Sequence, residues 1–154
     1  MLDLQVVFID LYRLLTIFGA SKTLSQMAEL HGGDPISQLM SPEIDEIKRI
    51  LVTASVTARI VDERENFIIP KEEFCGELIP DLSNPVQVVG LNLREACNKI
   101  IHANRIRTDL ERENEKPFLL PKLYFYGKRG QQEWKATLNV YEFISTYYEV
   151  FKSA

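Results

Sequence analysis

The spacing of apolar residues changes near residue 106, and this change restricts the chain to folds that contain both helices and strands. Before that point apolar residues recur every three or four positions, which is typical of amphipathic helices. After it apolar and charged residues alternate, which is typical of strands with one buried face. With 154 residues the chain is long enough to bury a core, so we expect residues 1–154 to form a single domain.

The first half of the chain is expected to form three helical segments. Residues 4–18 are apolar on most sides, so this helix should be buried in a core or packed against a second chain. Gly19-Ala20-Ser21 predicts a bend or break, and a second piece then runs to the stop signal His31-Gly32-Gly33-Asp34-Pro35. Ser41-Pro42 predicts the N-cap and first residue of a long helix that ends at about Arg64, antiparallel to the first helix.

Residues 66–91 are unsuited to a long helix, because three prolines and two glycines interrupt them. The short runs 67–69 and 86–89 are compatible with strands or with buried extended segments, and the sequence leaves both options open. The segment is too long for an ordinary connection, so we expect it to pack on the helices.

The alternating part of the chain predicts three strands, at 106–110, 119–126 and 133–138, with a hairpin turn at 127–130. In the last of these strands Trp134, Ala136 and Leu138 fall on one face. Asn139 and Glu142 form a capping box that begins a final amphipathic helix. The predicted fold is mainly α within the α+β class. It is a bundle of about four helices, with a small antiparallel sheet at about 106–138 inserted before the C-terminal helix.

Residues 92–105 carry the main candidate site. Asn92 and Glu95 form a capping box, which predicts a helix that extends to about Asn104 or Arg107. At about 100° per residue, four polar side chains lie within roughly 80° of one another beside an apolar face. Such groups cost desolvation free energy unless they have partners. The four residues are Arg94, Asn98, His102 and Arg105.

This polar stripe has two interpretations. A metal-free ribonuclease needs a group that exchanges protons near neutral pH and a cation that binds phosphate. His102 would then be the general acid or base, Arg94 and Arg105 would hold the phosphate, and Asn98 would orient the scissile group. That interpretation expects His102 and Arg94 to be exposed in a cleft. Alternatively the stripe is structural, and His102 is buried with both ring nitrogens hydrogen-bonded.

Lys128 and Arg129 lie in the predicted hairpin turn, with further lysines and three aromatic residues on the adjoining strands. This pattern is compatible with an RNA-binding projection, since aromatic rings stack on bases and cations bind phosphates. The alternative is a solvated turn above a strand pair whose aromatic residues pack on the helices. The aromatic residues are Tyr124, Tyr126 and Trp134.

The net charge of −4 is distributed unevenly along the chain. Residues 1–90 carry 7 Lys and Arg against 14 Asp and Glu, a net charge of −7, whereas residues 91–154 carry 11 against 8, a net charge of +3. The acidic first part argues against general coating of nucleic acid. The basic second part is compatible with a local contact to a polyanion.

Cys75 and Cys97 lack the CxxC spacing of zinc and redox sites, so we expect free thiols in a reducing cytoplasm, with no metal and no cofactor. The apolar N-terminal run has no basic region before it and is interrupted by Asp10 and Arg13. We therefore expect neither a signal peptide nor a membrane span.

The segment Asn98-Lys99-Ile100-Ile101-His102, together with the apolar N-terminal helices, resembles the HEPN superfamily. That family has an Arg, usually followed by a polar residue, then about three residues and a His. Here Asn98 and His102 match, but Cys97 occupies the position of the family's Arg. Arg94, one helical turn earlier, could stand in for it. The resemblance covers about ten residues closely and the helical part loosely.

The resemblance implies a helical bundle that dimerises, so that two copies of the motif helix form a cleft that binds and sometimes cuts RNA. The replacement of the Arg by Cys97 implies a degenerate member that binds RNA or nucleotides, in a defence or toxin-type system. We expect His102, Arg94 and Asn98 to be catalytic if the protein cleaves, and Arg105, Lys128 and Arg129 to bind the substrate. A homodimer is expected through helix 4–18, the 92–105 helix, or both. The alternative is a non-enzymatic protein-interaction module with an unknown partner.

Overall fold

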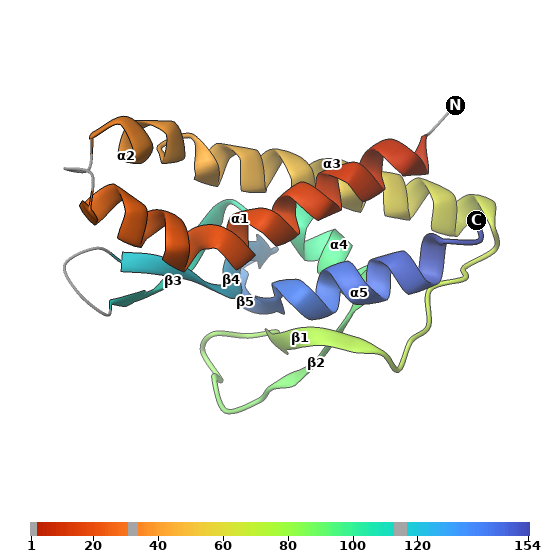
Figure 1. The fold of residues 1–154 in the computed structure, drawn as a ribbon. Coiled ribbons are helices and arrows are strands. Elements are labelled where there is room, and N and C mark those ends of the chain that lie inside the picture. Colours follow the sequence, from red (N-terminus) through yellow and green to blue (C-terminus); the bar gives the residue numbers. More distant parts are fainter. Residues whose placement is uncertain (1–2, 31–33, 113–116) are drawn as a thin grey trace.

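The computed structural model of the protein describes residues 3–30, 34–112 and 117–154 (Figure 1). These residues form one antiparallel five-stranded sheet with strand order β2-β1-β5-β4-β3, together with five helices. Of the predicted stop at 31–35, residues 31–33 lie outside the described residues, and Asp34 and Pro35 begin a short helix over Asp34–Met40. The elements are α1 (Leu4–Leu30), α2 (Asp34–Met40), α3 (Glu43–Arg64), β1 (Phe74–Ile79), β2 (Val89–Asn92), α4 (Leu93–His102), β3 (Arg105–Arg112), β4 (Pro117–Arg129), β5 (Gln132–Asn139) and α5 (Val140–Phe151).

The α+β class is confirmed, but the predicted sheet was too small and partly misplaced. β1 and β2 precede α4, so the sheet is not confined to an insert before the last helix. The strand β1 contains Gly76, where a Cβ atom would overlap the carbonyl oxygen of Thr137 on β5. The close approach of the two strands therefore requires glycine at this position. From the sequence alone, Gly76 could be recognised only as a residue that disfavours a helix.

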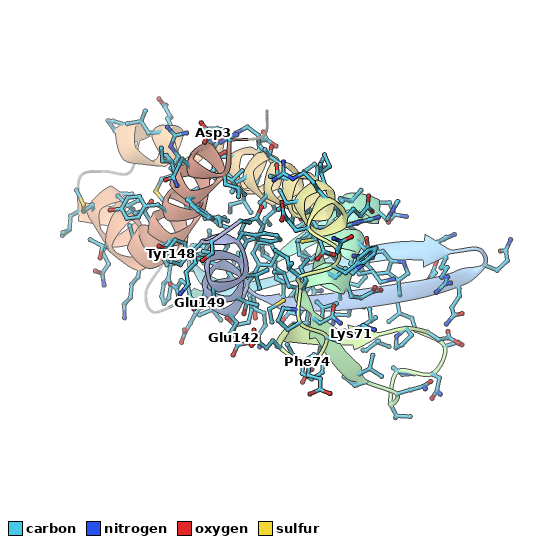
Figure 2. The ribbon with its side chains drawn as sticks, turned by 90° about the vertical axis from the view of Figure 1, so that its right-hand side faces the viewer. Asp3, Lys71, Phe74, Glu142, Tyr148 and Glu149 are labelled. Carbon is cyan, nitrogen blue, oxygen red and sulfur yellow. The ribbon has the colours of Figure 1, made fainter. Side chains whose placement is uncertain are left out.

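The helices pack on one face of the sheet. Figure 1 shows α1 and α3 running side by side in opposite directions, as expected for a short connection, and the second half of α1 packs directly on β4. Burial alternates along β5, where Trp134, Ala136 and Leu138 are all buried. Leu123 and Phe125 of β4 are buried on the same side. Figure 2 shows the β4–β5 hairpin extending beyond the helices, away from α1.

The helix α1 is continuous from Leu4 to Leu30, so of the predicted bend or break at Gly19-Ala20-Ser21 the break does not occur. Its second half is held against β4 by two polar contacts. The backbone N–H of Leu119 donates to Ser21 Oγ at 2.8 Å, and Ser25 Oγ donates to the carbonyl oxygen of Pro117 at 2.9 Å. These tertiary contacts outweigh the low helix propensity of one glycine.

The segment Leu4–Ala28 is long and apolar enough to cross a membrane, judged by length and composition alone. In this structure, however, it is a core helix of the domain. Its inner residues Val7, Leu11, Leu14 and Phe18 are each at most 4% exposed and belong to the same core as α3 and the sheet.

The helix α3 begins one residue later than predicted. Pro42 occupies the N-cap position, where no side chain caps the helix, and the hydroxyl of Ser41 donates instead to the carbonyl oxygen of Gln38. The first turn contains Glu43, Asp45 and Glu46, and such carboxylates stabilise the positive end of a helix dipole.

The carboxylate of Asp62 joins α3 to the segments that follow it. Asp62 is fully buried, and its Oδ1 accepts a hydrogen bond from the backbone N–H of Ile69 at 2.9 Å. Its Oδ2 forms an ion pair with Arg94 on α4. Residues 67–69 therefore form a turn held by Asp62, rather than a strand, and Asn66 and Phe67 adopt positive φ.

We predict that Asp62→Ala lowers the free energy of unfolding by about 3–5 kcal/mol, because it removes one partner of a buried ion pair. Urea unfolding followed by circular dichroism measures this change. Glu65→Ala, three residues further along the chain, removes an exposed carboxylate and should change the free energy by no more than about 0.5 kcal/mol. Equal stability of the two variants would contradict the role assigned to Asp62.

Candidate functional site

The helix α4 begins as the capping box predicts. The backbone N–H of Glu95 donates to Asn92 Oδ1 at 2.9 Å, and Leu93, Ala96 and Cys97 are buried. The helix ends at His102, earlier than predicted, because Ala103 is already extended. Arg105 therefore belongs to β3, so the predicted four-residue stripe does not exist as one helical face.

Arg94 is held by structural contacts. Its guanidinium pairs with the buried Asp62 carboxylate and lies 4.8 Å from the centre of the Phe67 ring. It does not line the cavity that contains His102. The structure thus separates Arg94 from the His102 imidazole that it was expected to assist.

Asn98 is bonded to a residue that the sequence did not single out. Arg59 of α3 donates through Nη1 to Asn98 Oδ1, and its Nη2 lies 3.3 Å from Glu63 Oε1. Within the described part of the chain, the buried Nε of Arg59 has no hydrogen-bond partner. The contact joins residues 39 positions apart, so sequence spacing gives no signal for it.

His102 lies at a cavity of about 440 Å³ between α3, α4 and the β4–β5 hairpin, which we call the basic cavity. His102 is exposed, in contrast to the buried histidine that the structural interpretation expects. Four permanently charged cations and a single carboxylate line this space. The lining residues are Arg59, Glu95, Asn98, Lys99, His102, Lys128, Arg129 and Trp134.

Lys99 lies between the Glu95 carboxylate and the Trp134 indole of this cavity. Its Nζ lies 3.4 Å from Glu95 Oε1 and 4.4 Å from the centre of the Trp134 ring. Lys128, at the hairpin, forms a more distant pair with Glu133 at 3.7 Å. Arg59 is likewise paired, with Glu63 at 3.3 Å, so Arg129 is the one lining cation without an ion pair among the described residues. The three carboxylates are exposed, and exposed ion pairs are weak and screened by salt.

The face of the sheet that points away from the helices carries tyrosines in contact with cations, which we call the tyrosine row. Its members are Arg105, Arg107, Tyr124, Tyr126 and Lys135. Arg105 lies 4.2 Å from the centre of the Tyr126 ring, and Arg107 lies 4.9 Å from that of Tyr124. Lys135 reaches both rings, at 4.6 Å from Tyr124 and 5.9 Å from Tyr126. Burial, together with a hydrogen bond from Tyr124 Oη to Asp109, raises the pKa of Tyr124.

The tyrosine row and the basic cavity adjoin. A second cavity of about 330 Å³ contains Arg105 and Tyr126, and it shares Lys128 and Trp134 with the basic cavity. The structure divides the three aromatic residues of the hairpin between the two faces of the sheet, and RNA binding by the hairpin stays a prediction. Trp134 packs towards the helices, while the two tyrosines lie on the other face. The turn itself is at Gly130-Gln131, so Lys128 and Arg129 are the last residues of β4.

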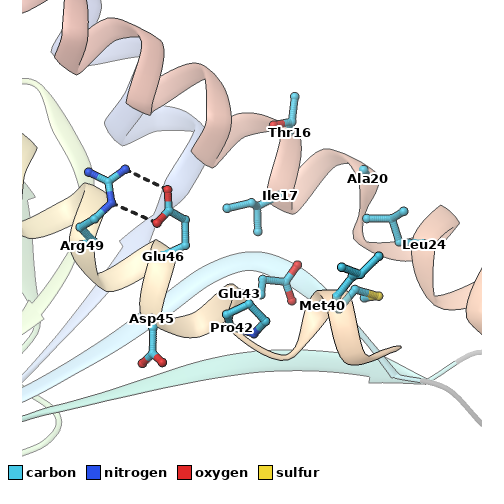
Figure 3. A pocket seen from close by; sticks show the side chains of 11 residues that line it. Thr16, Ile17, Ala20, Leu24, Met40, Pro42, Glu43, Asp45, Glu46 and Arg49 are labelled. Carbon is cyan, nitrogen blue, oxygen red and sulfur yellow. Dashed lines mark hydrogen bonds and ion pairs between the residues drawn. The ribbon is translucent and has the colours of Figure 1, made fainter. Parts of the chain in front are cut away.

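A larger cavity than the basic cavity lies elsewhere, between α1, α2 and α3, with a volume of about 660 Å³. Figure 3 shows Ile17 and Leu24 of α1 facing this space, opposite Met40 and Glu43. Burial raises the pKa of the Glu43 carboxyl. The cavity is mainly apolar and shares no lining residue with the basic cavity.

Both cysteines are buried, and desolvation raises the pKa of each thiol to about 12. The thiolate is the reactive form of cysteine. The structure therefore gives Cys97 no nucleophilic role. Among residues 3–30, 34–112 and 117–154, no group of three or more His, Cys, Asp or Glu side chains is placed to hold a metal ion.

We predict that Cys75 and Cys97 of the folded protein resist alkylation by iodoacetamide at pH 8.5, because this pH is well below the raised pKa of both thiols. Mass spectrometry counts the labels. In urea both cysteines should react within the same time, which serves as the control. Rapid labelling of the folded protein would contradict the buried, protonated state.

In comparisons with known proteins, no family model, no curated protein and no solved structure matches the chain. The resemblance to HEPN domains therefore still rests on Asn98, His102 and the surrounding helical pattern, and it stays a prediction.

Proposed function

We propose that the protein binds single-stranded RNA along the tyrosine row and into the basic cavity. The observation that carries this proposal is the continuity of the two regions through Lys128 and Trp134. Cations contact the phosphates of a strand, and aromatic or guanidinium planes stack on its bases. Bases of a single strand are free to stack in this way, whereas those of a duplex are not.

The distribution of charge supports a local contact with RNA. The first 90 residues are acidic, and they contribute a single cation, Arg59, to the basic cavity. The other permanent cations of the cavity and of the tyrosine row lie beyond residue 91. RNA would therefore be attracted to this region and repelled from most of the helical surface.

The exposure of His102 favours RNA binding over a purely structural polar stripe. The protein-interaction alternative expected both ring nitrogens to be satisfied within a buried site, and His102 is exposed at a cationic cavity. That alternative does describe Arg94 and Asn98, whose side chains bond to Asp62 and Arg59. Of the three stripe residues on α4, Arg94 and Asn98 are therefore engaged in structural contacts and His102 is exposed at the basic cavity.

We predict that Tyr126→Ala raises the Kd for an unstructured RNA by about 5-fold to 100-fold, because one stacking platform is worth roughly 1–3 kcal/mol. Fluorescence anisotropy in EDTA measures the Kd, which should also rise with salt as cation–phosphate contacts are screened. Tyr141→Ala removes a 40% exposed tyrosine from α5 and is the matched control, with no expected effect. Absence of binding by the wild-type protein would refute the proposal.

Cleavage of the bound RNA is a second candidate function, favoured by the exposed imidazole of His102 among four cations. Metal-independent cleavage of RNA uses a proton-transferring group close to a group that binds the phosphate. Arg59, Lys99, Lys128 and Arg129 would hold the phosphate in place of Arg94.

We predict that, if the protein cleaves, it degrades a pooled RNA in EDTA and that His102→Ala abolishes this activity without loss of the circular dichroism spectrum. Gel electrophoresis of the RNA measures the activity. Cleavage that persists in the folded His102→Ala variant would place the reaction elsewhere. Intact RNA with both proteins would leave binding as the function.

The homodimer stays a prediction as well. The outer side of α1 keeps apolar residues in solvent, with Val6, Ile9 and Tyr12 each more than half exposed. These side chains are available to a second copy of the chain, as the sequence predicted for helix 4–18. The defence or toxin-type setting and the cytoplasmic location also remain predictions from the sequence.

A further inference from the structure

We propose that the basic cavity binds a terminal phosphate monoester of the RNA strand; this inference rests on the proposed binding function and names the ligand of one part of the site. A phosphodiester within a strand carries one negative charge. A terminal monoester carries between one and two near neutral pH, and it presents three oxygen acceptors. The two groups therefore differ in the charge density that they require from a protein.

The cavity supplies a high density of positive charge in a limited space. Arg59, Lys99, Lys128 and Arg129 line about 440 Å³, and Glu95 is the one carboxylate among the lining residues. Glu95 pairs with Lys99 at 3.4 Å, while Glu63 and Glu133 pair with Arg59 and Lys128 at 3.3 and 3.7 Å without lining the cavity. Arg129 has no carboxylate partner among the described residues, and the three ion pairs of the other cations are at least partly exposed to solvent. A volume of this size accommodates a phosphate with its adjoining nucleotide.

Arg59 is held in place for such a ligand. Asn98 and Glu63 bind its two terminal nitrogens, so the guanidinium is fixed between α3 and α4. The Nε atom nevertheless remains buried without a partner in the described part of the chain. Buried donors of this kind are nearly always hydrogen-bonded, so the protein partners of Arg59 leave one of its donors unsatisfied.

The position of the cavity suits the end of a strand. The tyrosine row lies on the face of the sheet that points away from the helices. The basic cavity lies on the helix side, between α3, α4 and the β4–β5 hairpin. Lys128 and Trp134 line both hollows and connect them. A strand that stacks along the tyrosine row therefore reaches the cavity with its terminal nucleotide, where α3 and α4 close the space behind it.

The test is a competition experiment in EDTA at low temperature. Three unlabelled eight-nucleotide RNAs of one sequence, with a 5′-phosphate, a 3′-phosphate or hydroxyl groups at both ends, compete against a labelled tracer RNA. We expect one of the two phosphorylated RNAs to bind about tenfold more tightly than the hydroxyl-ended RNA, as one further charge-assisted contact allows. The phosphorylated RNA that binds more tightly identifies whether the 5′ or the 3′ end of the strand enters the cavity.

Variants separate the cavity from the tyrosine row. Arg59→Gln should reduce the preference for the phosphorylated RNA to within about twofold, and Arg129→Gln, at the exposed end of β4, should do the same without touching the core. Tyr126→Ala should weaken all three RNAs by the same factor and preserve the preference.

Equal affinity for all three RNAs with the wild-type protein would overturn this inference and leave RNA binding intact. Failure of every RNA to bind would overturn both. A preference that survives in folded Arg129→Gln and Arg59→Gln proteins would also overturn the inference, because it would place the recognition of the terminal phosphate outside the basic cavity.

Discussion

The buried carboxylate of Asp62 is the interaction on which the arrangement of the site depends. It bonds to the backbone of the turn that follows α3 and to Arg94 at the start of α4, so it joins three segments in the interior. A buried charge is tolerated only with such partners. Because α4 is fixed against α3 in this way, Asn98 meets Arg59 and His102 is placed at the cavity mouth.

The strand β4 contributes to the core and to the proposed ligand surface at the same time. Leu123 and Phe125 enter the core. The residues that alternate with them, Tyr124 and Tyr126, contact cations on the opposite face. A shift in the pairing of β4 by one residue would exchange the two sets. Stability of the core and presentation of the tyrosines are therefore set by one register.

Local patterns in the sequence were sufficient for much of the fold, and contacts between distant residues account for what they missed. The capping boxes at Asn92 and Asn139 and the buried alternation around Trp134 depend on neighbours in the chain, so they could be predicted. Gly19 does not break α1, and Gly76 allows β1 to approach β5 closely, because tertiary packing decides what a glycine does within an element. Arg59 could not be found, since its role arises from contacts across 39 residues.

Trp134 is placed where its intrinsic fluorescence depends on the surroundings of the basic cavity. It is the one tryptophan of the chain, it lines both hollows of the proposed site, and its ring faces the ammonium of Lys99 at 4.4 Å. Gly127 leaves room for the indole, since a Cβ atom there would overlap it. A ligand that draws Lys99 away changes the electrostatic field at the ring. We therefore expect the intrinsic emission of the unmodified chain to change when a ligand enters the basic cavity.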